Sequence, residues 1–269
     1  MKFLSHVYRH INILSFDVVA GAVVGAMFLG RLFSVSVPLA VRVALALSVW
    51  IVYTLDHLRD AMAIPTRAST DRHRFHQKYF GIILTILIIV IAVDVTLIWF
   101  LPAAVVKASL ILGPAVLVYL FFQKHLRFFK EFFVACLYTA GILLPSLTEA
   151  NWDFAPEQIV IIVKYFLTAL MNLLLFSLFD FHQDRYQRQH SFVTRFGPVS
   201  ARYWIIVIGL INIFGSFWLT SYDPDVALVF ICMDMILFSV LYFDRRLVVN
   251  NYYRMIGDAV FFIPLLYTV

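Results

Sequence analysis

Long runs of apolar residues, separated by short polar segments, make up almost the whole chain. A helix needs about 20 mostly apolar residues to cross the hydrocarbon core of a bilayer, and nine runs come close to this length. The pattern therefore predicts an all-α membrane protein, a single polytopic bundle of about nine transmembrane helices over residues 1–269. The predicted spans are residues 11–32, 38–56, 79–100, 103–122, 131–148, 157–180, 201–220, 225–243 and 252–269.

Prolines and glycines refine this division. Residues 79–122 are apolar almost throughout and too long for one span, so we divide them at Leu101-Pro102. In the first span, Gly21 and Gly25 form a G-x-x-x-G pattern, which predicts close packing against another helix. Four spans begin at or just after a proline, where a missing N–H does little harm: Pro38, Pro102, Pro156 and Pro224.

Composition supports a membrane protein. Hydrophobic residues make up 62% of the chain and charged residues 14%, whereas about a quarter of a soluble domain is charged. This excludes a soluble enzyme, a disordered chain and a nucleic-acid-binding module. The net charge of +5 is explained by basic residues that set topology and face anionic headgroups. No signal-peptide pattern is visible, so the first span is expected to be retained, and Cys136 and Cys232 are expected to be core residues.

Basic residues concentrate in every second connecting segment, which places most of them on one side of the predicted bundle. One set of segments, the N-terminus with loops 57–78, 123–130, 181–202 and 244–254, holds 17 of the 21 Lys and Arg residues and all eight His. The positive-inside rule assigns this set to the cytoplasm. The N-terminus is thus predicted to be cytoplasmic and, with nine spans, the C-terminus to lie outside.

Several polar residues lie inside the predicted spans. Each of the acids could face a cavity or pair with a partner, and Asn172 and Tyr138 are candidate cavity residues. By the predicted topology, Asp17 and Asp258 are expected on opposite sides and are not expected to pair. The acids within spans are Asp17, Asp94, Asp234 and Asp258.

The two longest cytoplasmic loops begin with the same spacing of acids. The second span ends in Asp56-His57-Leu58-Arg59-Asp60 and the sixth in Asp180-Phe181-His182-Gln183-Asp184. If each helix continues one turn past the membrane, residues i and i+4 share a face, with Cβ atoms about 5–6 Å apart. Two facing pairs would bring four carboxylates together, and cations must neutralise their repulsion.

Mg²⁺ suits this arrangement, because it prefers carboxylates combined with phosphate oxygens and water. The pattern predicts a Mg²⁺–phosphate or Mg²⁺–diphosphate site at the cytoplasmic membrane surface. Its predicted metal ligands, which are also the predicted catalytic residues, are Asp56, Asp60, Asp180 and Asp184.

A plainer explanation of each acid pair is a solvated helix end. A single D-x-x-x-D is common, neighbouring Arg and His residues could pair with it, and the helix dipole disfavours carboxylates at a C-terminus. A role is favoured because a chain with only 16 acids places two such pairs at equivalent positions. Ionisable groups at a membrane edge usually have a function when they face a cavity.

Basic residues follow both acid pairs and stand in the loop after the fourth span. Arginine forks suit diphosphate oxygens and lysine supplies a point charge, although topology and headgroup contact explain any one of them equally well. The predicted diphosphate-binding residues are Arg67, Arg72, Arg74, Lys124, Arg127, Arg185 and Arg188.

Over nearly its whole length, the chain resembles the UbiA-type intramembrane prenyltransferase superfamily. The second Asp-rich loop is the closer match. Family members tend to read D-x-x-x-D, a Gly four residues on, then Thr-Leu-Pro and a Gly. Here Asp180, Asp184 and Gly197 match, Ser191 stands in for the threonine, and Arg188 replaces the first glycine.

The first loop departs further from the family pattern, N-D-x-x-D-x-x-x-D. Asp56 and Asp60 fit the last two acids, but Val52 and Tyr53 occupy the Asn and first Asp positions. The Lys-Arg expected after the fourth span is approximated by Lys124 and its neighbour histidine. The missing Asn and acid remove two metal or water ligands, which implies a different diphosphate, weaker Mg²⁺ binding or an inactive site.

The resemblance implies transfer of a polyprenyl group from a polyprenyl diphosphate to a small acceptor, with aromatic compounds among the candidates. Mg²⁺ would bridge the Asp pairs and the diphosphate and stabilise charge on the leaving oxygen. Aromatic faces would stabilise the allylic carbocation and exclude water. The implied location is a multi-pass protein of the inner or plasma membrane if the source is bacterial, with the active site facing the cytoplasm and membrane lipid around it.

Two other classes stay open. A terpene cyclase or diphosphate lyase would use the same metal site without an acceptor. A non-catalytic transporter or lipid-binding scaffold would carry a degraded site, and inverted repeats would favour the transporter. The sequence specifies neither the acceptor, the prenyl chain length, a protein partner nor the oligomeric state, and no nucleic-acid partner is expected.

Overall fold

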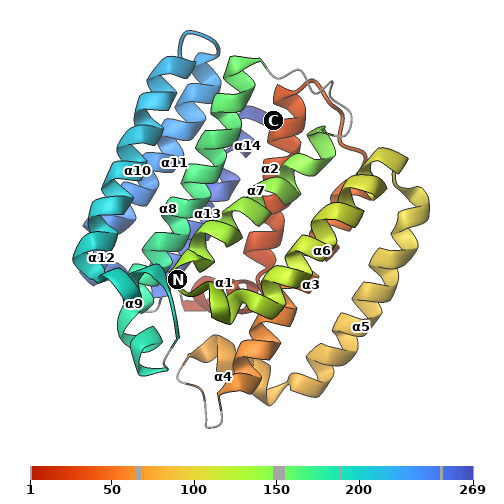
Figure 1. The fold of residues 1–269 in the computed structure, drawn as a ribbon, viewed down its shortest axis with the longest axis vertical. Helices are drawn as coiled ribbons and strands as arrows, with labels where there is room; N and C mark the ends of the chain where they lie inside the picture. The colour runs from red at the N-terminus through yellow and green to blue at the C-terminus, as the bar shows by residue number, and fades with distance from the viewer. Residues whose placement is uncertain are drawn as a thin grey trace.

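The computed structural model of the protein describes residues 2–64, 68, 70–147, 155–187, 189–248 and 251–268. The described residues form helices joined by short connections, and the helices pack into a bundle (Figure 1). The long helices are α2 (Phe16–Leu32), α3 (Leu39–Ala63), α5 (Phe80–Leu97), α6 (Ala103–Leu126), α7 (Lys130–Leu147), α8 (Pro156–Tyr186), α10 (Pro198–Leu219) and α11 (Pro224–Tyr242).

Short helices connect or cap the long ones. Helix α8 packs against α7, α10 and α11, whereas α2 packs against α3 and α7, and α5 lies outermost against α3 (Figure 1). The short elements are α1 (Lys2–Ile13), α4 (Asp71–Lys78), η1 (Ile98–Phe100), η2 (Arg127–Phe129), α9 (Phe192–Phe196), α12 (Asp244–Leu247), α13 (Tyr252–Ala259), η4 (Val260–Phe262) and α14 (Leu265–Thr268).

The helices that carry the acid pairs extend past the predicted span ends. Helix α3 continues from the predicted end at residue 56 to Ala63, and α8 continues from residue 180 to Tyr186. Each acid pair therefore lies on a helix, as its spacing requires. The predicted division between the third and fourth spans is confirmed, because η1 ends at Phe100 and α6 begins at Ala103.

The first and last predicted spans are each broken. The first divides into α1 and α2 at Ser15, whose φ of 58° lies in the left-handed region and cannot continue a helix. The last divides into α13, η4 and α14, and Pro264, which lacks an N–H, precedes α14. Helix α13 carries Arg254 and Asp258, charged side chains that a continuous last span would hold in lipid.

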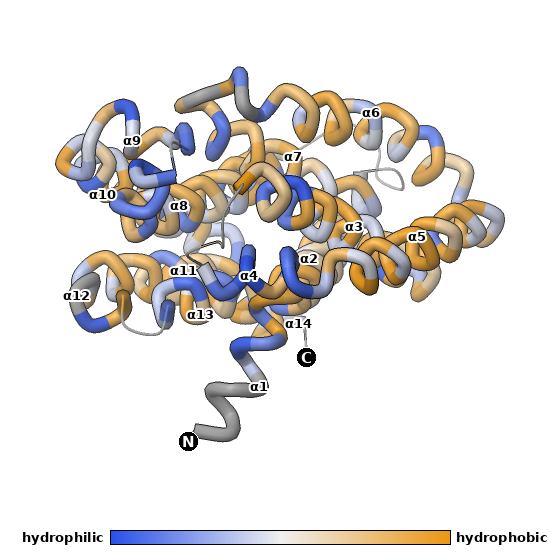
Figure 2. Tube along the Cα trace, turned by 90° about the horizontal axis from the view of Figure 1, so that it is seen from below, coloured by the Kyte–Doolittle hydropathy of each residue, from blue (hydrophilic) through white to orange (hydrophobic). Residues whose placement is uncertain are grey.

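Six helices in the described part of the chain are long and apolar enough to cross a membrane. The set is Leu39–Ala63, Phe80–Phe100, Ala103–Gln123, Pro156–Tyr186, Pro198–Leu219 and Pro224–Tyr242. The total of nine spans and the sides of the two termini remain predictions. Figure 2 shows α5 and α6 as mostly hydrophobic, whereas hydrophilic residues gather at α1, α4 and α9. Exposed isoleucines of α5 such as Ile82 and Ile88 indicate a lipid-facing surface, and the protein is an integral, multi-pass membrane protein.

The largest core joins α2, α7, α8, α10 and α11 with the C-terminal elements. Small residues on α2 let it approach its neighbours. A Cβ at Gly21 would lie 2.9 Å from Phe261 Cβ, and one at Gly25 would overlap the Tyr165 hydroxyl and stand 3.3 Å from Ile142 Cδ1. The close packing predicted from G-x-x-x-G is confirmed, and aromatic side chains from α8 and η4 fill the space.

A polar cluster buried in the same core ties α8, α10 and α11 together. Asn212 donates to Asp234 Oδ1 (2.7 Å) and to Thr168 Oγ1 (2.8 Å). The Lys164 ammonium lies 3.7 Å from Asp234 Oδ2, and both side chains are at most 2% exposed. Within the membrane, where water is absent, such charges must be paired. Asp234 is thus one of the acids that pairs.

Replacing Gly25 by alanine is expected to lower the free energy of unfolding by about 1–3 kcal/mol, because the added methyl group overpacks a buried site. Tyr165 cannot retreat, since its side chain is fully buried. Thermal unfolding in detergent measures the effect. Gly113→Ala is the matched control, because no atom lies within 4 Å of a Cβ there. Equal stability of the two variants would contradict the close contact.

Candidate active site

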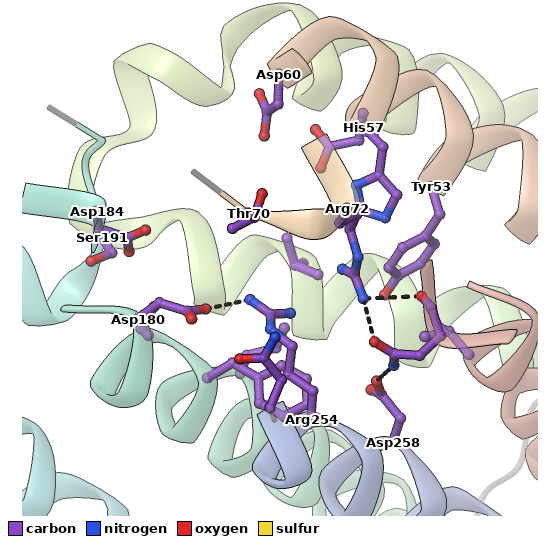
Figure 3. A pocket seen from close by; sticks show the side chains of 18 of the residues that line it. Tyr53, His57, Asp60, Thr70, Arg72, Asp180, Asp184, Ser191, Arg254 and Asp258 are labelled. Carbon is purple, nitrogen blue, oxygen red and sulfur yellow. Dashed lines mark hydrogen bonds and ion pairs between the residues drawn. The ribbon is translucent and has the colours of Figure 1, made fainter. Parts of the chain in front are cut away.

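The two acid pairs line the same cavity. It has a volume of about 670 Å³, and most residues around it come from α1, α3, α4, α6, α7, α8 and α13, with others from α2 and η4. Asp60 and the pair Asp180/Asp184 enter from different sides (Figure 3). The convergence of Asp56, Asp60, Asp180 and Asp184 on one pocket follows from the packing of α3 and α8 around α7.

The first acid pair contacts α6. The Gln123 amide donates to Asp56 Oδ1 at 2.6 Å, and the Tyr119 hydroxyl donates to Gln123 Oε1 at 3.3 Å. A neutral amide thus holds Asp56. Asp60 lies one helical turn further on the same helix and also lines the cavity.

The second acid pair contacts α13. The Tyr253 hydroxyl donates to Asp180 Oδ1 at 2.5 Å, and the Arg254 guanidinium forms an ion pair with Asp180 Oδ2. Both oxygens of Asp180 are therefore engaged by two consecutive residues. Asp184, one turn later on α8, lines the cavity beside them (Figure 3).

Helices α1 and α4 complete the polar end of the cavity. Thr70 caps α4 by accepting from the backbone N–H of His73 at 3.1 Å. Asp71 forms ion pairs with Arg9 of α1 and with Arg74 of its own helix. This places Arg72 and Arg74, two of the predicted diphosphate-binding residues, in the cavity wall.

Asn12 links charges from three parts of the chain. Arg72 donates to its backbone oxygen (3.1 Å) and to its side-chain Oδ1 (3.0 Å). The Asn12 amide donates to Asp17 (2.6 Å) and to Asp258 (3.1 Å). The expectation that Asp17 and Asp258 lie on opposite sides is wrong, because both follow soon after the start of a predicted span at the same end of the bundle.

Burial and neighbouring charge shift the pKa values of the α4 side chains. Burial lowers the pKa of Arg72, and the positive charge of Arg254 lowers it further. Burial, with help from Arg72, lowers the pKa of His73 to about 4, so this imidazole is neutral at pH 7. Burial acts to raise the pKa of Asp71, but Arg74 and Arg9 outweigh it and the pKa is lowered.

Helix α7 contributes one cation and one acid at its first turn. Lys130 is close enough to interact electrostatically with Asp56, Asp60 and Asp184, that is, with both pairs. Glu131 accepts from Ser177 Oγ (2.5 Å) and from the Phe192 backbone N–H (3.0 Å), which joins α7, α8 and α9. Lys130 therefore lies between the two carboxylate pairs.

Aromatic side chains line the cavity beside the polar groups. Both candidate cavity residues, Asn172 and Tyr138, are confirmed in the lining. The Tyr138 ring contacts the Phe261 ring edge-on, with centroids 5.5 Å apart. The Asn172 Oδ1 atom and the Tyr138 hydroxyl are buried without a hydrogen-bond partner among the described residues. Which rings face the cavity could not be read from the sequence, because phenylalanine is also common on lipid-facing helices.

The other predicted diphosphate-binding residues are placed differently. Arg185 is exposed on α8 and is not one of the lining residues. Arg67 and Arg188 fall outside the described residues, as do the side chains of Lys124 and Arg127.

The sequence reasoning did not identify several lining residues as part of the site: Arg9, Asn12, Lys130, Glu131 and Arg254. Their shared signal is a polar residue at the edge of a predicted span, on the side predicted to be cytoplasmic.

The carboxylates of the site suit Mg²⁺ only if a bound ligand supplies further oxygen atoms. Each acid pair offers two carboxylates, but nowhere in the described chain do three His, Cys, Asp or Glu side chains converge on one metal position. Mg²⁺ usually binds one or two carboxylates and completes its shell with phosphate oxygens and water. The residues present fit that mode. Seven carboxylates and five Arg or Lys side chains line the cavity, so an anionic ligand requires an added cation.

No family model matches the chain, and no curated protein matches it in sequence. Among solved structures, it resembles digeranylgeranylglyceryl phosphate synthase, with a TM-score of 0.56 and 12% identity over 97% of this chain and 98% of that one. That protein is a UbiA-type prenyltransferase. The chain therefore has the UbiA-type fold, which confirms the resemblance to that superfamily at the level of the fold.

Replacing His73 by glutamine is expected to reduce the loss of stability on acidification. Between pH 6.5, the ordinary value, and about 4, the unfolded chain takes up a proton at this residue and the folded protein does not, so stability falls as pH falls. Unfolding midpoints at pH 7.5 and 5 measure the difference. His182→Gln, at an exposed position on α8, should behave as wild type, and an unchanged acid response in His73→Gln would refute the assignment.

Proposed function

We propose that this protein is a membrane-embedded prenyltransferase that moves a polyprenyl group from its diphosphate to a small acceptor. The observation that carries the proposal is the meeting of Asp56/Asp60 and Asp180/Asp184 with basic side chains at one cavity. The likeness of the fold to digeranylgeranylglyceryl phosphate synthase supports it.

The diphosphate would bind where the cations converge. Arg72, Lys130 and Arg254 line the cavity from three different helices, and arginine forks match phosphate oxygens. Mg²⁺ held by the aspartates and the diphosphate would neutralise the charge that develops on the leaving oxygen. The chain's own cations would orient the diphosphate and lower the same charge.

The transfer itself needs little covalent help from the protein. The C1–O bond of the donor breaks and its electron pair leaves with the diphosphate, which gives an allylic cation. The acceptor's nucleophilic atom bonds to C1 and loses a proton to a carboxylate or diphosphate oxygen. The rings of Tyr53, Tyr138, Phe176 and Phe261 line the cavity, where they would stabilise the cation and exclude water.

The position of the cavity in the bundle supports a donor whose tail stays in the membrane and an opening toward the cytoplasm. The cavity is walled by helices of a multi-pass bundle, so a polyprenyl tail can stay in lipid while its diphosphate reaches the polar end. The positive-inside rule favours the cytoplasm for the end that holds α1, α4 and α9.

The double variant Asp56→Asn/Asp180→Asn is expected to lose Mg²⁺-dependent binding of a polyprenyl diphosphate by about 100-fold or more, because it removes one carboxylate from each pair. Binding to the purified protein in detergent, with and without Mg²⁺, measures this. Asp225→Asn, exposed at the start of α11 and outside the cavity, serves as control.

The outcomes separate the candidate functions. Binding that needs neither Mg²⁺ nor the aspartates, or no binding at any Mg²⁺ concentration, would leave a non-catalytic scaffold. Release of diphosphate without any acceptor would instead identify a cyclase or lyase. Consumption of the donor that requires a small acceptor is the result the proposal expects.

A further inference from the structure

Two half-buried arginines from distant parts of the chain line one cavity. Arg72 comes from α4 and Arg254 from α13 (Figure 3). They are close enough for the charge of Arg254 to act on Arg72. Two like charges facing the same space repel unless anions lie nearby. The nearby carboxylates of Asp17, Asp180 and Asp258 offset part of this repulsion, and both guanidinium groups line the cavity where an anion would bind.

Arg254 is held in place before any ligand arrives. Its ion pair with Asp180 fixes one side of the guanidinium. The ring of Phe176 lies 5.0 Å from the guanidinium carbon and that of Tyr253 5.7 Å. Tyr253 is itself stacked on Phe179, with centroids 4.5 Å apart. A guanidinium has five N–H donors, and this side chain, 26% exposed, lines the cavity.

Asp56 of the first acid pair and Asp180 of the second have partners of different charge. Asp56 accepts a hydrogen bond from the neutral amide of Gln123, whereas Asp180 meets the full positive charge of Arg254 and the phenol of Tyr253. A carboxylate whose two oxygens are already bonded by Arg254 and Tyr253 is a poor ligand for a second cation. Asp56 thus remains suited to a divalent cation, whereas Asp180 is already bonded to the positive charge of Arg254.

Arg72 is placed differently from Arg254. It donates hydrogen bonds to the neutral oxygens of Asn12, and the Asn12 amide in turn donates to Asp17 and Asp258. Arg72 is therefore oriented by an amide and has no carboxylate bonded to it in the described ion pairs. Its positive charge is directed at the cavity.

We propose that Arg254 takes the place of a second divalent cation at the α8 acid pair, so that the site binds a diphosphate with one divalent cation together with Arg254 and Arg72. The inference rests on the proposed function, because it concerns the same diphosphate. It assigns Arg254 as a substrate-binding residue and makes the two halves of the site chemically unequal.

Counting bound ions tests this without any assay of catalysis. Mn²⁺ replaces Mg²⁺, and the ions bound per protein at saturating inorganic diphosphate are counted from the loss of the free-ion electron paramagnetic resonance signal. Wild type is expected to bind one ion. Arg254→Gln releases Asp180 and is expected to bind two. Two or more ions on the wild-type protein would overturn the inference.

Affinity for inorganic diphosphate gives the second readout. At limiting Mn²⁺, Arg254→Gln is expected to bind about ten- to a hundredfold more weakly than wild type, because a charge-assisted contact is lost. Excess Mn²⁺ should restore part of the affinity, and Arg254→Lys should lie between the two proteins because it keeps the charge without the fork. Arg195→Gln, at an exposed position on α9 outside the cavity lining, should bind as wild type.

Failure of this inference and failure of the proposed function would give different results. If wild type binds diphosphate and Arg254→Gln, shown to be folded by its unfolding midpoint, binds it equally well at limiting Mn²⁺, the Arg254 contact is structural only and the inference is overturned alone. If wild type binds no diphosphate at any Mn²⁺ concentration, the proposed function is overturned with it.

Discussion

The rest of this structure depends on the need to balance charges that have been taken out of water. In a bilayer no solvent satisfies a stray carboxylate or ammonium, and the buried charged residues in the described part of the chain have polar or charged partners on other helices. Lys164 meets Asp234 across the core, and Arg254 meets Asp180 beside the cavity. Breaking such a pair strands the remaining charge, which is far more costly than never burying either.

The charges around the cavity are only partly balanced, and this imbalance makes the cavity a candidate binding site. Around the cavity, carboxylates outnumber cations, yet two arginines face each other there. Groups of both signs are held near one another by Asn12, Gln123 and Tyr253 instead of being fully neutralised. An arrangement of this kind is stable in the fold but still able to bind an anion with its counter-cation, which is what a diphosphate site requires.

The departures from the UbiA-type pattern are consistent with this chemistry. Tyr53 stands where the family has its first acid and lines the cavity as an aromatic ring. Fewer ligands for metal on α3, and an arginine already bound to Asp180, both reduce the number of divalent cations the site can hold. In the proposed site, fixed positive charge from Arg254 would stand in for part of the metal-binding capacity of the family pattern.

The sequence by itself determined the helical membrane class, most helix boundaries and the two acid pairs, because hydrophobic runs and i, i+4 spacing are local properties. It did not reveal the break at Ser15, since one residue in the left-handed region leaves no hydropathy signal. Only the tertiary structure decided that Asp17 and Asp258 share Asn12, that Arg254 binds Asp180 and that Arg185 is exposed. Those facts depend on how α1, α8 and α13 pack. Asp180 with Arg254 and Asn12 with Asp258 are contacts between residues some 70 to 250 positions apart. No periodicity in the chain predicts such contacts.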